Sequence, residues 1–180
     1  MKNSKIILVT GGGRSGKSVY AQRMAEALPA PRVFLATCPV IDAEMEDRIR
    51  KHQAMRAQAD WKTVEEPVDL VRAVGQLSSD TVILVDCLTL WINNLMFEAE
   101  KKGEVLTEPD VARQCESLTQ LIRTRGGTVI FVTNEVGMGI IPENPLCRAY
   151  RDLAGRANQV IAEAADQVVL MVCGQPLRIK

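Results

Sequence analysis

The sequence predicts an α/β protein with a mostly parallel sheet flanked by helices. Five short apolar runs alternate along the 180 residues with longer amphipathic stretches. Each run is continuously apolar rather than alternating, which is typical of parallel strands that are covered on both faces. Parallel neighbours need long, right-handed crossover connections, and the amphipathic stretches supply them. The expected strands cover residues 5–10, 32–37, 81–86, 128–133 and 167–173.

The stretches between these runs have helical periodicity. Apolar residues at 111, 115, 118 and 122 are spaced by four, three and four positions, so they share one helical face. Residues 150, 153, 157, 160, 161 and 164 form a second such face. Further helices are expected after Gly16, over 88–99, and over 42–58, where most of the helix surface is charged.

The chain is expected to end in an antiparallel edge strand. Residues 168–173 and 177–180 are joined by Gly174-Gln175-Pro176, and these residue types favour a turn. No internal repeat, low-complexity tract or Gly/Ser linker divides the sequence. Residues 1–180 are therefore predicted to form a single domain.

A phosphate-binding loop follows the first expected strand. Its sequence matches G-x-x-x-x-G-K-[ST], with an apolar strand before it and a helical pattern after it, as a P-loop requires. Glycines let backbone N–H groups point at phosphate oxygens, and the helix N-terminus adds its positive end. Lys17 is expected to bridge the outer phosphates, and the Ser18 hydroxyl to bind Mg²⁺. The predicted loop consists of Gly11, Gly12, Gly13, Arg14, Ser15, Gly16, Lys17 and Ser18.

A second metal-directed group lies at the end of the strand expected over 81–86. That apolar strand terminates in Asp86, whose carboxylate is suited to hold Mg²⁺ or a metal-bound water. The alternative is that Asp86 caps the helix expected over 88–99.

These features predict a nucleoside triphosphate site without naming the reaction. A regulatory GTPase would have N-K-x-D at a later strand end, where this chain has Thr133-Asn134-Glu135-Val136. Small-molecule kinases clamp the transferred phosphoryl group with arginines. Arg148, Arg151 and Arg156 are candidates, although three arginines on one helix also fit a solvated face.

His52 is the only histidine of the chain. It lies in the basic stretch Arg48-Ile49-Arg50-Lys51-His52-Gln53-Ala54-Met55-Arg56. Basic neighbours lower the pKa of an imidazole and favour the neutral form, which can attack phosphorus to give a phosphoramidate. The alternative is a solvent-facing histidine on a charged helix.

Composition excludes several other classes. There are 22 basic and 22 acidic residues, and zero net charge argues against a nucleic-acid or anionic-membrane footprint. No apolar run approaches the roughly 18 residues of a membrane span, and the N-terminus lacks the pattern of a signal peptide. An odd number of cysteines without C-x-x-C indicates reduced, mostly buried thiols in a cytoplasmic protein, and argues against disulfides or a zinc site. They are Cys38, Cys87, Cys115, Cys147 and Cys173.

Over essentially its whole length the sequence resembles the bifunctional adenosylcobinamide kinase/adenosylcobinamide-phosphate guanylyltransferases of cobalamin biosynthesis. A P-loop alone is widely shared, whereas the ordered set of matching segments is specific. These segments are residues 10–18, Ala36-Thr37-Cys38, His52-x-x-x-Arg56, Asp86-Cys87-Leu88-Thr89, residues 133–139, and Arg151-Asp152-x-Ala154-Gly155-Arg156-x-Asn158-Gln159.

The resemblance implies two reactions on one RecA-like P-loop domain that assembles as a homotrimer. The first phosphorylates adenosylcobinamide with ATP or GTP. The second transfers GMP from GTP to adenosylcobinamide phosphate through a covalent intermediate on His52, giving adenosylcobinamide-GDP and pyrophosphate. Residues 134–158 and the helix over 88–95 are candidates for the corrinoid pocket.

The resemblance also implies a set of nucleotide contacts besides the phosphate loop. Among them Glu65 is interchangeable with Glu66 by sequence spacing alone. The implied residues are Ala36, Thr37, Cys38, Gln53, Ala54, Met55, Arg56, Glu65 and Asp86. Two alternatives remain at this point: a P-loop kinase without nucleotidyl transfer, and a nucleotide-switched binding protein.

Overall fold

The computed structural model describes residues 4–28, 31–38 and 60–180. The helix expected over 42–58 falls outside these residues. So do five predicted site residues, namely His52, Gln53, Ala54, Met55 and Arg56.

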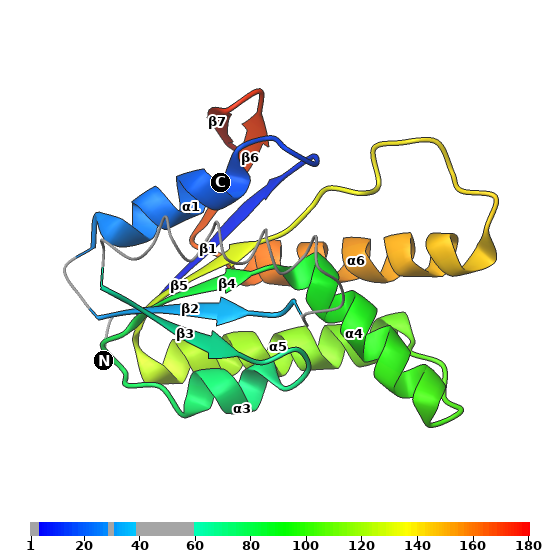
Figure 1. Ribbon diagram of the computed structural model, residues 1–180, viewed down its shortest axis with the longest axis horizontal. Helices are drawn as coiled ribbons and strands as arrows, with labels where there is room; N and C mark the ends of the chain where they lie inside the picture. The colour runs from blue at the N-terminus through cyan, green and yellow to red at the C-terminus, as the bar shows by residue number, and fades with distance from the viewer. Residues whose placement is uncertain (1–3, 29–30, 39–59) are drawn as a thin grey trace.

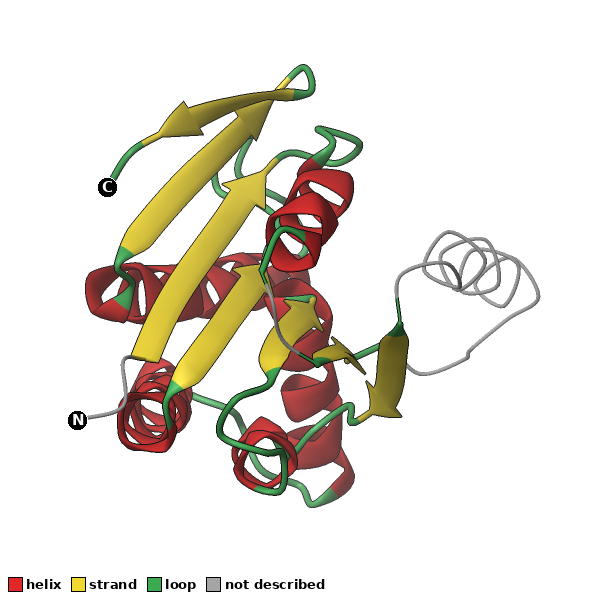
Figure 2. Ribbon diagram, turned by 90° about the vertical axis from the view of Figure 1, so that its left-hand side faces the viewer, coloured by secondary structure: helices red, strands yellow, loops and turns green. Residues whose placement is uncertain are grey.

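The described residues form one sheet with helices on both faces (Figures 1 and 2). The strand order is β3-β2-β4-β5-β1-β6-β7, with every neighbouring pair parallel except β6 and β7. The strands are β1 (Ser4–Gly11), β2 (Arg32–Ala36), β3 (Trp61–Glu65), β4 (Val82–Asp86), β5 (Gly127–Val132), β6 (Gln167–Val172) and β7 (Gln175–Arg178). The helices are α1 (Lys17–Glu26), α3 (Leu70–Gly75), α4 (Leu88–Lys101), α5 (Glu108–Arg125) and α6 (Pro145–Ala164).

This architecture confirms the predicted fold class. All five predicted strands are present, and the central strands β1, β4 and β5 are buried along most of their length, as continuous apolar runs require. β7 is antiparallel to β6 at the edge of the sheet. Its position corrects one prediction, because the turn is Cys173-Gly174 and β7 already begins at Gln175. Pro176 lies within this edge strand, where a missing N–H is tolerated.

Two elements were not predicted, β3 and α3. β3 forms the other edge of the sheet, and none of its five residues is fully buried, so its sequence lacks the apolar run of a central strand. α3 has six residues, too few to establish a helical period. Asp69 begins it by accepting a hydrogen bond from the Arg72 backbone N–H.

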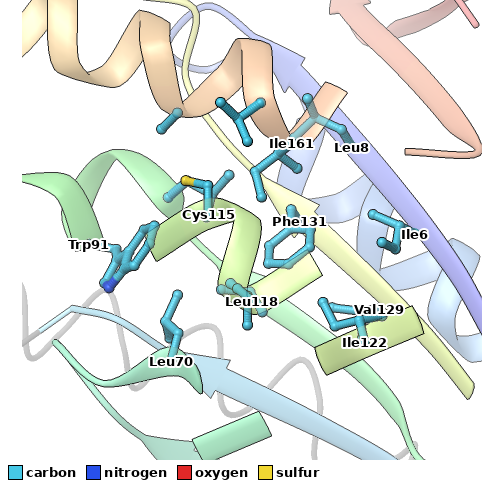
Figure 3. Close-up of a cluster of buried hydrophobic side chains, with 14 of the residues drawn as sticks. Ile6, Leu8, Leu70, Trp91, Cys115, Leu118, Ile122, Val129, Phe131 and Ile161 are labelled. Carbon is cyan, nitrogen blue, oxygen red and sulfur yellow. The ribbon is translucent and has the colours of Figure 1, made fainter. Parts of the chain in front are cut away.

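The core is divided by the sheet into two layers. The larger layer lies between the sheet and α3, α4, α5 and α6, and Figure 3 shows Phe131, Leu118 and Trp91 gathered in it. The smaller layer lies beneath α1 and includes Ala21 and Ala25. Both faces of the parallel strands are thereby removed from water, and burial on this scale is the main favourable contribution to folding.

A polar connection fixes β1 where it enters the sheet. The Ile6 backbone N–H donates to the Asp166 carboxylate at 2.7 Å. The Arg123 guanidinium holds the same carboxylate through two hydrogen bonds, at 2.9 and 3.0 Å. The start of β1 and the ends of α5 and α6 therefore meet at one carboxylate.

The cysteines are more exposed than predicted. Only Cys87 and Cys115 are buried, whereas Cys38 is half-buried and Cys147 and Cys173 are exposed. The exposed pair lies on the first turn of α6 and in the β6–β7 turn, so neither contributes to the core. Within the described ranges, no helix combines the length and apolar character needed to cross a membrane.

Candidate active site

The predicted site residues that the structure describes gather at the carboxyl edge of the sheet. β1 ends in the phosphate loop, and β2 and β4 end at Ala36 and Asp86, which are paired in register. β5, which ends at Val132, lies between β1 and β4. Ligands of open parallel sheets bind outside this edge, so the topology places phosphate loop and carboxylate where a nucleotide can reach both.

The phosphate loop is built on backbone that only glycine fits. Gly11 has φ +151°, and a Cβ there would lie 2.6 Å from the carbonyl oxygen of Met171. Gly16 caps α1 with φ +91°, and as a glycine it has no side chain to accept from the first N–H groups of that helix. These N–H groups together with the helix dipole form an anion site. Gly12, Gly13 and Arg14 are exposed.

Two hydroxyl groups at this loop are buried without a partner among the described residues, Thr10 Oγ1 and Ser15 Oγ. Buried polar groups are almost always hydrogen-bonded in native proteins, so orphaned hydroxyls mark a place where a polar ligand or water is expected. Thr10 precedes the phosphate loop and Ser15 lies within it, which agrees with a phosphate-binding role for the loop.

Lys17 lies inside the loop rather than on the surface. Only 8% of the residue is exposed, and Nζ donates to the Gly12 carbonyl oxygen at 3.0 Å. Burial lowers the pKa of Lys17, while the charge of Asp86 opposes this shift. A desolvated cation held by the loop itself is suited to neutralise charge on outer phosphates.

Asp86 is not the cap of α4. The N-cap residue of that helix is Cys87, and no side-chain hydrogen bond caps it. Asp86 instead influences the pKa of Lys17, which brings the two charged groups into one site. Mg²⁺ typically uses one or two protein oxygens together with phosphates and water, and Ser18 and Asp86 are suited to be those oxygens.

The hydroxyl of Thr37 joins the ends of β2 and β4. It donates to the Cys87 carbonyl oxygen at 2.8 Å and accepts from the Cys87 N–H at 2.7 Å, and Thr37 is fully buried. Asn94 on α4 donates to the Thr37 carbonyl oxygen at 2.7 Å. The hydroxyl and the carbonyl oxygen of Thr37 therefore both help to hold the backbone beside Asp86.

The structure separates Glu65 from Glu66. Glu66 is buried, with 9% of the residue exposed. Its carboxylate accepts hydrogen bonds from the N–H groups of Val68 and Asp69 at 3.0 and 2.9 Å, and from the Arg72 guanidinium at 2.5 Å. It is committed to the start of α3. Glu65 is exposed at the carboxyl end of β3, paired with Ala36. Glu65 is thus better placed than Glu66 to contact a ligand.

A polar network that the sequence reasoning missed lies next to this site. Thr89 accepts from the Asn134 side chain at 2.9 Å through Oγ1 and from the Tyr150 hydroxyl at 3.2 Å through its carbonyl oxygen. Asn158 accepts from Thr133 at 2.7 Å and donates to the Asn134 carbonyl oxygen at 3.3 Å. The network ties the segment that follows β5 to α4 and α6. In the sequence, polar residues at positions 89 and 158 within mainly apolar helix faces could have indicated it.

The three candidate arginines of α6 have other contacts. Arg148 donates to the carbonyl oxygens of Pro142 and Glu143 at 2.9 and 2.6 Å, which holds the loop before α6. Arg151 pairs with the adjacent Asp152. Arg156 lines a groove of about 580 Å³ against α5. These positions support structural roles and give no support to the phosphoryl-clamp hypothesis.

The parallel sheet and the phosphate loop after β1 define a P-loop α/β fold, and solved structures of distant proteins resemble it. It is similar to a KaiC-like protein of Pyrococcus horikoshii, with a TM-score of 0.53, 16% identity, and coverage of 92% of this chain and 70% of that one. It is also similar to an ATPase of a bacterial type III secretion system, with a TM-score of 0.57, 12% identity, and coverage of 92% and 50%. At these identities the likeness concerns the fold alone.

Within that class, the chain belongs to the family described as cobinamide kinase / cobinamide phosphate guanyltransferase, whose profile matches residues 7–179. A bifunctional adenosylcobalamin biosynthesis protein, CobU, of Salmonella typhimurium is 41% identical over 97% of this chain and 99% of its own length. CobU of Escherichia coli is 38% identical with the same coverage. CobP of Pseudomonas aeruginosa is 37% identical over 96% of both chains. The predicted family is confirmed.

Proposed function

We propose that this protein carries out two steps of cobalamin biosynthesis. It phosphorylates the aminopropanol hydroxyl of adenosylcobinamide with ATP or GTP, and then transfers GMP from GTP to the resulting phosphate. The products of the second step are adenosylcobinamide-GDP and pyrophosphate. The observation that carries the proposal is the near full-length match to relatives named as bifunctional, on a chain that has a complete phosphate loop.

In the kinase step, the chain supplies positioning and charge rather than a covalent group. Lys17 neutralises charge on the transferring phosphoryl group, and Ser18 and Asp86 would hold Mg²⁺, which would supply further positive charge at the phosphates. Support comes from the burial of Lys17 and from its electrostatic link to Asp86. Ala36, Thr37, Cys38 and Glu65 belong to the same edge of the sheet and complete the described part of the nucleotide site.

In the transferase step, the neutral imidazole of His52 attacks the α-phosphorus of GTP. A P–N bond forms, the bond from the α-phosphorus to the bridging oxygen breaks, and pyrophosphate leaves. An oxygen of adenosylcobinamide phosphate then attacks the same phosphorus, and the P–N bond breaks with its electron pair returning to the imidazole. A covalent step replaces one encounter between two anions by two ordinary displacements. Gln53, Ala54, Met55 and Arg56 are proposed to accompany His52 at the nucleotide.

The test is incubation of the protein with Mg²⁺ and GTP labelled in the α-phosphate. Label is expected on the protein, in a bond that is acid-labile and base-stable, with release of pyrophosphate. GTP labelled in the γ-phosphate should leave no label in this adduct. His52→Ala should abolish the adduct and GMP transfer but retain substantial kinase activity. Lys17→Ala, the matched control, should impair both reactions by orders of magnitude.

Each deviating result has a defined meaning. An adduct that persists in His52→Ala makes another residue the nucleophile. Loss of both activities in a folded His52→Ala protein makes His52 a nucleotide-binding residue. A wild-type protein that phosphorylates adenosylcobinamide without forming any adduct is a P-loop kinase without nucleotidyl transfer.

We also propose that the protein is a cytoplasmic homotrimer that binds neither nucleic acid nor membrane. The zero net charge and the family relationship support this assignment. Light scattering coupled to size-exclusion chromatography measures the mass of the assembly directly. A mass other than three times 19.8 kDa would contradict the trimer.

A further inference from the structure

The turn between β6 and β7 lies against the phosphate loop. Val172 and Gln175 are paired, so the turn has two residues, Cys173 and Gly174, with φ of +52° and +78°. Positive φ at both central positions defines a mirror-image hairpin turn, which matches the twist of the flanking strands. The register of β6 on β1 continues up to the pair Met171 and Gly11, so the hairpin is joined firmly to the residue where the loop begins.

The contact between turn and loop is made by backbone atoms. The Gly174 N–H donates to the carbonyl oxygen of Ser15 at 3.0 Å. A Cβ on Gly16 would lie 3.3 Å from the Gly174 Cα, so a side chain at position 16 would crowd the turn. A Cβ on Gly174 would meet no atom within 4 Å, so the close approach restricts position 16 and not position 174.

This hydrogen bond fixes the orientation of one peptide plane. In a trans peptide the C=O of one residue and the N–H of the next point in opposite directions. Because the hairpin holds the Ser15 carbonyl, the Gly16 N–H is directed away from the hairpin. Gly16 is the N-cap of α1, where N–H groups without helical partners form the phosphate site.

We propose that the Gly174 N–H is a positioning group for nucleotide binding: it orients the Ser15–Gly16 peptide so that the Gly16 N–H points at the nucleotide phosphates. The inference rests on the proposed use of the loop as a phosphate site. It adds a determinant from the other end of the chain, more than 150 residues from the motif. A loop already oriented before binding loses less conformational freedom when it binds.

The test removes this one N–H and keeps the side chains. Cys173 allows ligation of residues 1–172, as a thioester, to a synthetic peptide of residues 173–180 in which glycolic acid replaces Gly174. The ester has no N–H to donate. The matched control is the same ligation with glycine. Both full-length products are refolded and titrated calorimetrically with Mg²⁺-GDP and with a Mg²⁺-GTP analogue that carries a methylene group between the α- and β-phosphates and so cannot release pyrophosphate. Their unfolding temperatures are measured without nucleotide.

The ester protein is expected to bind both nucleotides about 3- to 10-fold more weakly, since a typical hydrogen bond contributes that factor. Equal affinities of ester and control, within twofold, would overturn the proposal. A lower unfolding temperature with unchanged affinity, measured well below that temperature, would also overturn it, because the hairpin would then only stabilise the fold. Binding is measured without cobinamide and without GMP transfer, so failure here is distinct from failure of the proposed function.

Two recombinant variants provide an independent readout. Cys173→Asn introduces a residue that tolerates positive φ, so the nucleotide affinity of this variant should equal that of the wild type. Cys173→Val places a β-branched residue at φ +52°, which disfavours the turn, and affinity should fall as in the ester protein. Equal affinities of these two variants would contradict the role of the turn.

Discussion

Replacing Thr37 by valine removes a hydroxyl group while nearly preserving the shape of the side chain. That hydroxyl both donates to and accepts from the backbone of Cys87, at 2.8 and 2.7 Å. Thr37 is fully buried, and Cys87 is 6% exposed, so water cannot readily replace the lost partner. The substitution therefore leaves an N–H and a carbonyl oxygen of Cys87 buried without this bond.

The expected cost follows from these two groups. Each buried polar group left without a partner costs about 1–3 kcal/mol, so Thr37→Val should lose about 2–6 kcal/mol of unfolding free energy. For a chain of this length, that corresponds to a fall of roughly 4–24 °C in unfolding temperature. Thr37→Ser keeps the hydroxyl and loses one methyl group, so its loss should be about 1 kcal/mol.

Urea denaturation and thermal unfolding of the three proteins measure these differences, and GTP titration measures binding. We call these two Thr37–Cys87 hydrogen bonds the Thr37 clamp. Because the Thr37 clamp holds the backbone beside Asp86, Thr37→Val should also weaken Mg²⁺-dependent binding, and Thr37→Ser should bind as the wild type does. Equal stability of Thr37→Val and Thr37→Ser would refute the Thr37 clamp. Weaker binding with unchanged stability would instead make the hydroxyl a direct ligand contact.

Three further outcomes are expected. Burial acts to raise the pKa of Asp166, but hydrogen bonds from Arg123 and the Ile6 N–H outweigh it and lower that pKa. The stabilisation by the Asp166 carboxylate is therefore complete above its unfolded-state pKa of about 3.9 and is lost as pH falls through its folded-state pKa. The stability deficit of Asp166→Asn should then shrink from pH 7 to pH 3 in denaturant titrations, and a constant deficit would contradict this. Gly11→Ala should destabilise by about 1–3 kcal/mol or more in the same titrations, since its Cβ would meet the Met171 carbonyl oxygen; wild-type stability would contradict the observed strand spacing. Burial raises the pKa of two thiols, to about 11 and about 12, so thiol reagents at pH 8 should label them only after unfolding, as mass spectrometry of digested protein would show; rapid labelling of the native protein would contradict their burial. These thiols are Cys87 and Cys115.

The parts predicted correctly from sequence depend on local signals. The phosphate loop is one contiguous motif between a strand and a helix, and the central strands are apolar runs, so both can be recognised without tertiary information. The position of Asp86 near the phosphate loop could be expected because strand ends in a parallel sheet share one edge, while its metal-binding role stays a prediction. β3 could not be found in this way, because an edge strand half-exposed on both sides has no such pattern.

Other parts depend on register between distant segments. Glu65 and Glu66 are neighbours in sequence, and only the pairing of β3 with β2 and the fold of α3 assign them different roles. The Thr37 clamp joins residues 50 positions apart. Arg148, Arg151 and Arg156 look alike in sequence but contact a loop, a neighbouring aspartate and a groove on α5.

Backbone contacts from two neighbouring segments hold the phosphate loop, and this bears on how one site could serve two reactions. The Glu135 N–H donates to the Gly11 carbonyl oxygen at 3.1 Å, so β5 as well as the β6–β7 hairpin holds the loop. A braced loop fixes the outer phosphates of a bound triphosphate and leaves side chains to choose which phosphorus is attacked. Phosphoryl transfer needs attack at the γ-phosphorus and GMP transfer at the α-phosphorus. In the proposed mechanism Lys17 would serve both steps because charge shifts on the outer phosphates in each, whereas His52 would affect only the step in which the α-phosphorus is the target.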